Sequence, residues 1–159
     1  QHPEVKLVIA PHVIDENHLV EIIRKLKRPY VRYTRADEKN VRKADCLIID
    51  CFGLLSSIYR YGEIAYIGGG FGVGIHNTLE AAVYGIPVIF GPKYQKFQEA
   101  IQLLEAKGAF SVKDYEELKT LLDRMLTDEV FLRESGMNAS NYVTGNAGAT
   151  DKIMSMINF

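Results

Sequence analysis

The sequence carries almost no net charge and contains no long apolar run. Its 19 Lys and Arg residues against 20 Asp and Glu residues give a formal net charge of −1, so the charge balance does not support nucleic-acid binding. No segment approaches the roughly 20 consecutive apolar residues of a membrane-spanning helix, and no apolar segment typical of a signal peptide opens the chain. We therefore expect one soluble globular domain, residues 1–159, with no nucleic acid as partner.

Cysteine is scarce, and the patterns of metal-binding and nucleophilic sites are missing. The two cysteines, Cys46 and Cys51, flank an apolar segment and lack the spacing of metal ligands, which predicts reduced thiols in a cytoplasmic protein. No Ser-His-Asp set, metal-binding cluster or close pair of carboxylates stands out. The sequence therefore predicts no metal, no cofactor and no catalytic residue on this chain.

Two familiar phosphate-binding motifs are missing as well, although residues 68–74 include five glycines. A P-loop requires Lys and Ser or Thr after its last glycine, whereas Ile75 follows Gly74. The dinucleotide pattern G-x-G-x-x-G fails because its last glycine would fall on Val73, Ile75 or Asn77, depending on where it starts. ATP hydrolysis of the kinase type and NAD-dependent hydride transfer thus lose their main support.

What the sequence does contain is a strand, a glycine-rich loop and a capped helix in succession. Residues 64–67 form the predicted strand, and the loop leads to Asn77, a natural N-cap with Glu80 as its capping-box partner. Glycines let the backbone approach an anion closely, and the free N–H groups at a helix start attract it. The segment therefore predicts a phosphate or nucleotide site. The alternative is a water-exposed turn that binds nothing, against which the entropic cost of the glycines argues.

Strands and helices alternate along the chain. Apolar runs predict the strands, and helical periodicity or N-cap residues predict most of the helices. The expected strands are 5–10, 30–33, 46–50, 64–67, 88–90 and a short one at Phe110. The expected helices are 15–26, 53–61, one starting at 77, 97–106, 114–126, 129–134 and 147–159, with breaks at Gly136, Gly145 and Gly148. This order predicts an α/β fold, a doubly wound parallel sheet of about six strands. Ligands should bind at the loops after Ala10, Asp50, Ile67 and Phe90.

Polar residues in these loops are the candidates for ligand contacts. His12 and His76 are suited to charge-assisted hydrogen bonds with a phosphate, the alternatives being an exposed His12 and a His76 bonded to backbone. Asp50 is either a ligand contact or only an N-cap. Glu80 either accepts from a ribose diol or completes the capping box.

Basic residues gather in two places. Nine fall between Arg24 and Lys43, which predicts a solvated face or, alternatively, a surface for an acidic partner or an anionic membrane leaflet. Lys93 and Lys96, with Tyr94 between them, follow the Gly-Pro turn and either hold an acidic sugar or lie in a solvated loop.

The motifs around the glycine loop resemble the donor-binding half of two-domain (GT-B) glycosyltransferases. The resemblance rests on the glycine loop, on His76-Asn77-x-x-Glu80 and on the Gly-x-Pro-Val-x-x-Gly-Pro pattern of residues 85–92. Three further segments agree: residues 9–12 with Glu16, residues 50–59, and residues 93–97 with 108–109 beyond them. Within this fold group the chain resembles the bacterial 3-deoxy-D-manno-octulosonic acid (Kdo) transferases of lipid A synthesis.

This resemblance implies a nucleotide-sugar-binding domain with CMP-Kdo as donor and transfer, with inversion, to a lipid A precursor. It also implies a membrane-anchored N-terminal domain, absent from this chain, which carries the catalytic base at the cytoplasmic face of the bacterial inner membrane. This chain alone should then bind the donor weakly and catalyse nothing. Carried over by position, the donor nucleotide and phosphate residues are Pro11, His12, Asp50, Phe52, Gly53, Gly68, Gly69, Gly70, His76, Asn77 and Glu80, and the possible donor-sugar contacts are Lys93 and Lys96.

The same residues are compatible with three other functions. A UDP-sugar transferase or a UDP-N-acetylglucosamine 2-epimerase shares the glycine loop, the downstream Glu and the Gly-x-Pro pattern, and differs in the nucleotide that it prefers. A non-enzymatic nucleotide- or sugar-binding module fits the same residues. A nucleic-acid binder that uses residues 24–43 is the least favoured and would show salt-sensitive binding.

Overall fold

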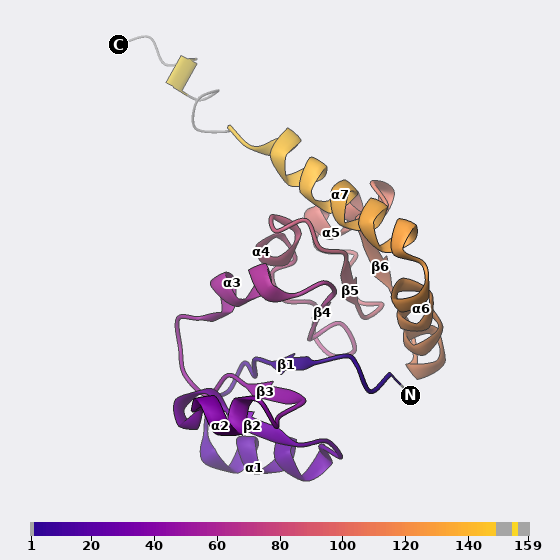
Figure 1. The fold of residues 1–159 in the computed structure, drawn as a ribbon. Helices are drawn as coiled ribbons and strands as arrows, with labels where there is room; N and C mark the ends of the chain where they lie inside the picture. The colour runs from indigo at the N-terminus through magenta and orange to yellow at the C-terminus, as the bar shows by residue number, and fades with distance from the viewer. Residues whose placement is uncertain (1, 149–153, 156–159) are drawn as a thin grey trace. The chain divides into compact units, whose positions relative to one another are not determined.

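The computed structural model describes residues 2–148 and 154–155, and it divides the chain into two compact units, residues 1–57 and 58–159. Each unit contains one parallel sheet of three strands. The six parallel strands alternate with helices, which confirms the predicted α/β class and strand number (Figure 1). The structure distributes these strands over two sheets. That residues 1–159 act as one donor-binding domain stays a prediction.

The first unit is built on β3, which pairs in parallel with both β1 and β2. Its elements are β1 (Leu7–Ile9), α1 (Glu16–Lys25), β2 (Tyr30–Arg32), the 3-10 helix η1 (Tyr33–Arg35), α2 (Glu38–Val41), β3 (Cys46–Ile48) and the start of α3 (Leu55–Ile58). The apolar face of α1 places Leu19 in a buried cluster with Cys46 and Ile48 of β3. Asp15 caps α1, because its carboxylate accepts the N–H of His18 at 3.0 Å.

The second unit is built on β5, which lies between β4 and β6. Its elements are the end of α3, the 3-10 helix η2 (Tyr59–Tyr61), β4 (Ala65–Ile67), α4 (Leu79–Ala82), β5 (Val88–Phe90), α5 (Gln98–Glu105), β6 (Ala109–Ser111), α6 (Tyr115–Thr127) and α7 (Glu129–Asn146). Side chains alternate between the faces of a strand. Val88 and Phe90 accordingly join a cluster that includes Ala82, whereas Ile89 joins another with Met125. Both faces of this sheet are therefore covered, as the doubly wound pattern requires.

The predicted breaks at Gly136 and Gly145 are wrong, because α7 runs without interruption from Glu129 to Asn146. A Cβ at position 136 would lie 2.2 Å from the carbonyl oxygen of Gly85. The glycine thus allows the helix backbone to pack directly against the turn before β5, and it does not end the helix. Of the helix predicted at 147–159, residues 147–148 follow the end of α7, and all others except 154–155 lie outside the described residues.

Candidate nucleotide-binding site

The glycine loop follows β4, and packing explains three of its five glycines. Gly69 has φ +96°, and a Cβ there would lie 2.2 Å from the carbonyl oxygen of Gly74. A Cβ on Gly70 would lie 2.7 Å from Gly91 Cα, and one on Gly74 would lie 2.9 Å from the ring of Phe97. At these positions the fold itself requires glycine, whether or not a ligand binds.

The other two glycines, Gly68 and Gly72, have no such requirement. A Cβ on Gly68 would come no nearer than 3.8 Å to its neighbours, and one on Gly72 no nearer than 3.7 Å. Both residues are exposed. The expectation that the glycines serve a ligand therefore rests on these two positions, and of the two only Gly68 belongs to the predicted site.

The loops after β4 and β5 lie side by side, as predicted for neighbouring parallel strands. The N–H of Lys93 donates to the carbonyl oxygen of Gly70 at 3.0 Å, and the backbones of Gly70 and Gly91 are in contact. Tyr94 is fixed next to this point, its ring 5.4 Å from that of Phe90. The exposed Lys93 thus starts from a backbone position held at the glycine loop.

His76 and Asn77 end the glycine loop, and both are exposed. The N–H of His76 donates to the carbonyl oxygen of Gly68 at 3.2 Å, which folds the end of the loop back on its start. Asn77 Oδ1 accepts the N–H of Leu79 at 3.0 Å, and its Nδ2 donates to Glu80 Oε1 at 3.0 Å. The two predicted contact residues, His76 and Asn77, are thereby placed beside Gly68.

The predicted cap of α4 is wrong in detail. The helix begins at Leu79, and its N-cap position is Thr78, not Asn77. Because Thr78 has helical backbone angles (φ −89°, ψ −25°), Asn77 forms a two-residue Asx turn to Leu79. The capping box is not formed either, since Glu80 accepts from the side-chain amide of Asn77. The pKa of the nearby Tyr59 hydroxyl is raised, mainly by burial and secondly by the negative charge of Glu80.

In the first unit, the predicted contact residues lie after β1 and β3. Ile9 and Ile48 are register partners at the ends of these paired strands, and the N–H of Ile49 donates to Ile9 at 2.8 Å. The loops that follow therefore leave the same edge of this sheet. They contain Pro11 and the exposed His12 in one, and Asp50, Phe52 and Gly53 in the other. Phe52 is 82% exposed and Gly53 has φ +87°.

Asp50 is held by side chains that the sequence analysis did not single out. Its Oδ2 accepts from Arg32 Nε at 2.7 Å and from Thr34 Oγ1 at 2.6 Å, while Oδ1 accepts the N–H of Thr34 at 2.9 Å. Burial alone would raise the pKa of Asp50, but the hydrogen bonds from Thr34 and Arg32 outweigh it and lower this pKa to about 2. The N-cap alternative for Asp50 is therefore wrong: the carboxylate joins β3 to β2.

Arg32 also contacts Glu16 at the start of α1, Nη1 lying 2.8 Å from Oε1 and 3.0 Å from Oε2. The positions of Arg32 and Asp50 relative to the two strands could have indicated their contact. Arg32 ends β2 and Asp50 follows β3, and the carboxyl ends of paired parallel strands meet at one edge. Asp50 can thus contribute its backbone to a ligand while its carboxylate stays bonded within the unit.

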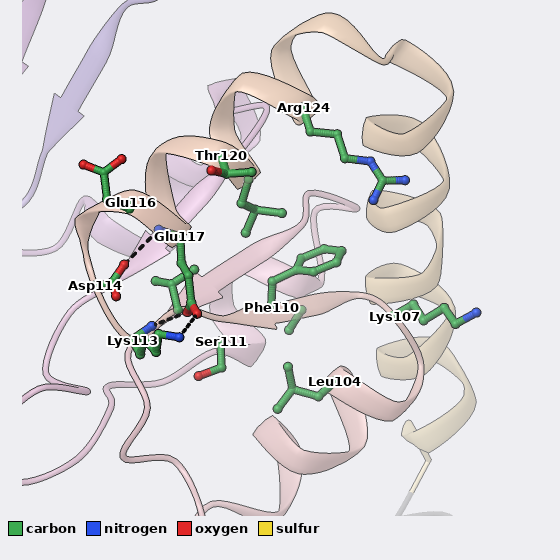
Figure 2. Close-up of a pocket in the computed structure, with 13 residues that line it drawn as sticks. Leu104, Lys107, Phe110, Ser111, Lys113, Asp114, Glu116, Glu117, Thr120 and Arg124 are labelled. Carbon is green, nitrogen blue, oxygen red and sulfur yellow. Dashed lines mark hydrogen bonds and ion pairs between the residues drawn. The ribbon is translucent and has the colours of Figure 1, made fainter.

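A surface cavity of about 790 Å³ lies elsewhere in the second unit, between β6 and α6 (Figure 2). None of the predicted contact residues lines it. Two of its charged side chains are already engaged: Lys113 pairs with Glu117 at 2.7 Å, and Arg124 stacks on the ring of Phe131. The glycine loop therefore remains the candidate site.

Within residues 2–148 and 154–155, no group of three or more possible metal ligands occurs, and no helix is long and apolar enough to cross a membrane.

Comparisons with known proteins identify the relatives of this chain. No protein-family model matches it. The 3-deoxy-D-manno-octulosonic acid transferase of Aquifex aeolicus is 36% identical over 128 residues, which cover 79% of this chain and 35% of that protein. The enzyme of the same name from Rickettsia bellii is 32% identical over 116 residues, 71% of this chain and 28% of that protein. A bifunctional glycosyltransferase/methyltransferase of Fusobacterium nucleatum is 30% identical over 148 residues, covering 86% and 23%.

Among solved structures, the C-terminal CMP-Kdo binding domain of WaaA from Acinetobacter baumannii has the same fold, with a TM-score of 0.76 over 89% of this chain and 75% of that domain. At 18% identity this likeness concerns the fold. The chain spans about a third or less of the length of the curated relatives named above. The resemblance predicted from the glycine-loop motifs is thus confirmed: the chain is a relative of the 3-deoxy-D-manno-octulosonic acid transferases.

Proposed function

We propose that this chain is the donor-binding part of a Kdo transferase and binds CMP-Kdo at the glycine loop. The observation that carries the proposal is Gly68, exposed beside His76 and Asn77 and free of any packing reason to be glycine. The names of the relatives and the CMP-Kdo binding domain of the same fold support it. Because the chain spans only part of those relatives, the transfer reaction is a proposal about a longer protein.

The ligand presents three chemical groups, and the predicted residues suit each of them. The phosphodiester is bound by backbone N–H groups of Gly68, Gly69 and Gly70, with His76 and Asn77 beside them. Glu80 accepts from the ribose diol. The carboxylate of the sugar is bound by the cationic side chains of Lys93 and Lys96, which are exposed after β5.

Residues 50–53 are proposed for the cytidine side of the donor, and Pro11 and His12 for the nucleotide and its phosphate. Pro11, His12, Phe52 and Gly53 contribute side chain or backbone, and the hydrophobic ring of Phe52 is exposed for contact with the base. Asp50 takes part through its backbone, because its carboxylate accepts from Arg32 and Thr34.

The rest of the reaction belongs to segments outside this chain. The proposed acceptor is a lipid A precursor at the cytoplasmic face of the inner membrane, and the proposed catalytic base lies in an N-terminal domain. Inversion at the anomeric carbon then requires both domains. The chain alone is proposed to bind donor without transferring Kdo.

A backbone amide NMR titration of the 159-residue chain with CMP, UDP and NAD tests this proposal. CMP is expected to shift the amides of residues 68–80, and UDP to shift them less. A preference for UDP would favour the UDP-sugar enzymes instead. If none of the three nucleotides shifts any amide resonance, the proposal that this chain binds a nucleotide is contradicted.

The Gly68→Ala variant tests directly whether the nucleotide binds at position 68. A methyl group fits at position 68 without a close contact, so the chain should fold, while the added Cβ stands where the phosphate approaches. We expect CMP affinity to fall about tenfold, or ~1.4 kcal/mol. Gly72→Ala is the matched control, since it is equally open in the same loop, and it should bind CMP as the wild type does. Equal CMP affinity of all three proteins would argue against the role of Gly68.

A further inference from the structure

A buried hydroxyl directly after the glycine loop lacks a hydrogen-bond partner. Thr78 is 1% exposed, and its Oγ1 is the buried side-chain polar atom without a partner among the described residues. An unpaired buried hydroxyl destabilises the state that contains it. Most buried side-chain polar atoms in native proteins have a hydrogen-bond partner, so this exception requires a physical explanation.

A suitable partner lies one turn further along the chain. In the described part of the chain, no acceptor is found for the N–H of Ala81, a residue that is 0% exposed in the first turn of α4. A Thr at the N-cap position ordinarily accepts the N–H two or three residues into the helix. For α4 that donor is Glu80 or Ala81. The structure therefore holds both halves of an N-cap bond that is not made.

The backbone explains why this bond is absent. A capping residue has extended backbone angles, whereas Thr78 has φ −89° and ψ −25°. The Asn77 side chain bonds to the start of the helix instead. Its Oδ1 accepts the N–H of Leu79 and its Nδ2 donates to Glu80 Oε1, each at 3.0 Å. Asn77 is also a proposed donor contact. Its amide cannot fully serve the helix and the ligand at the same time.

We propose that donor binding exchanges the cap of α4. When the Asn77 amide turns to the nucleotide, Thr78 becomes extended and its Oγ1 accepts the N–H of Ala81. The hydroxyl thus compensates the helix for the bonds that Asn77 gives up. Thr78 is a positioning residue in this inference, which rests on the proposed function because it requires a nucleotide at the glycine loop.

The loop has room for this change. Gly68 and Gly72 are exposed, a Cβ on either would meet nothing nearer than 3.7 Å, and Val73 is fully exposed. Gly70, by contrast, is fixed against Gly91. Gly74 is packed against the ring of Phe97 and Ile75 is 6% exposed, so the movement is confined to residues 76–78.

Thr78→Val and Thr78→Ser test the exchange, because Val keeps the shape without the hydroxyl and Ser keeps the hydroxyl. CMP is the probe, with calorimetric affinity, thermal unfolding and the Ala81 amide resonance as readouts. In Thr78→Val we expect an unchanged or higher melting temperature without ligand, and about tenfold weaker CMP binding. CMP should shift the Ala81 amide in wild type and Thr78→Ser but much less in Thr78→Val, and Thr78→Ser should bind CMP within about twofold of wild type.

The contrary outcomes separate the two proposals. Equal CMP affinity of wild type and Thr78→Val would overturn the cap exchange and leave donor binding intact. A melting temperature several degrees lower in ligand-free Thr78→Val would also overturn it, since the hydroxyl would then already be bonded. If wild type does not bind CMP, the proposed function fails, and the cap exchange fails with it.

Discussion

Arg32 Nε lies 2.7 Å from Asp50 Oδ2, and this contact joins the ends of two neighbouring strands, β2 and β3. The Asp50 carboxylate is wholly buried, and the Arg32 side chain is 13% exposed. Burying a charge is unfavourable unless it is paired and hydrogen-bonded. Here Thr34 supplies the further hydrogen bonds to Asp50, and Glu16 shares the guanidinium.

Asp50→Asn should strongly destabilise the chain. The substitution leaves the Arg32 guanidinium without its buried counter-charge, and breaking such a pair costs about 3 kcal/mol or more. Urea unfolding at neutral pH measures the change. Glu16→Gln is the control, because it removes the exposed partner of the same guanidinium, for which a loss below ~1 kcal/mol is expected. Similar losses in the two variants would contradict the importance of the buried pair.

The same carboxylate predicts an acid-sensitive step in stability. The pKa of Asp50 is lowered from its ordinary 3.8 to about 2. A lowered pKa in the folded state stabilises at pH values above the unfolded-state pKa, and this stabilisation is lost as pH falls through the folded-state pKa. Between about pH 4 and pH 2, the wild type should therefore lose about 2 kcal/mol more than Asp50→Asn. Parallel pH profiles of the unfolding free energy would rule this out.

Two glycines of α7 predict opposite responses to the same substitution. Gly136→Ala should be destabilising, by about 1–3 kcal/mol, because the new Cβ would lie 2.2 Å from the Gly85 carbonyl oxygen. Gly145→Ala should stabilise by about 0.5–1 kcal/mol, because nothing lies within 4 Å and alanine favours the helix. Thermal or urea unfolding of both variants gives the comparison. A stabilising Gly136→Ala would mean that the helix does not pack on Gly85 as described.

Glu80→Gln separates the proposed ribose contact from a structural role. The side-chain carbonyl of the introduced glutamine can still accept from Asn77 Nδ2, in a bond that is exposed to solvent, so the melting temperature should change little. CMP affinity should fall about tenfold if the carboxylate accepts from the ribose diol, as a hydrogen bond to a charged group is worth about 1.5 kcal/mol or more. With 2′-deoxy-CMP the variant and wild type should differ much less. A lower melting temperature with unchanged CMP affinity would instead assign Glu80 to the helix.

The strands could be predicted from sequence because they are short apolar runs between turn residues. Val88–Phe90 shows why this works: all three residues are 0% exposed, so no polar residue interrupts the run. The glycine loop was equally visible, and so was its nearness to the turn at Gly91. The sequence could not show which glycines pack against backbone. Gly68 and Gly70 belong to the same run of three glycines and differ only in the atoms that surround them in the fold.

Where prediction failed, a contact distant in sequence decided the outcome. Gly136 looked like a helix break because its partner, Gly85, is 51 residues away, counting from 85 to 136. Asp50 looked like a cap because Arg32 and Thr34 come from another strand and turn. The cap of α4 was misplaced by one residue, since the backbone angles of Thr78, not its type, determine where the helix starts.

The direct backbone contact of Gly70 with Gly91, with the bond from Lys93 to Gly70, has a consequence for protein engineering. Where Gly70 meets Gly91 the contact is between backbone atoms, which cannot change rotamer to absorb a misfit. A graft that replaces residues 68–77 with a loop of different specificity must bring its own version of residues 91–93. The smallest unit that can be transplanted is therefore this pair of loops.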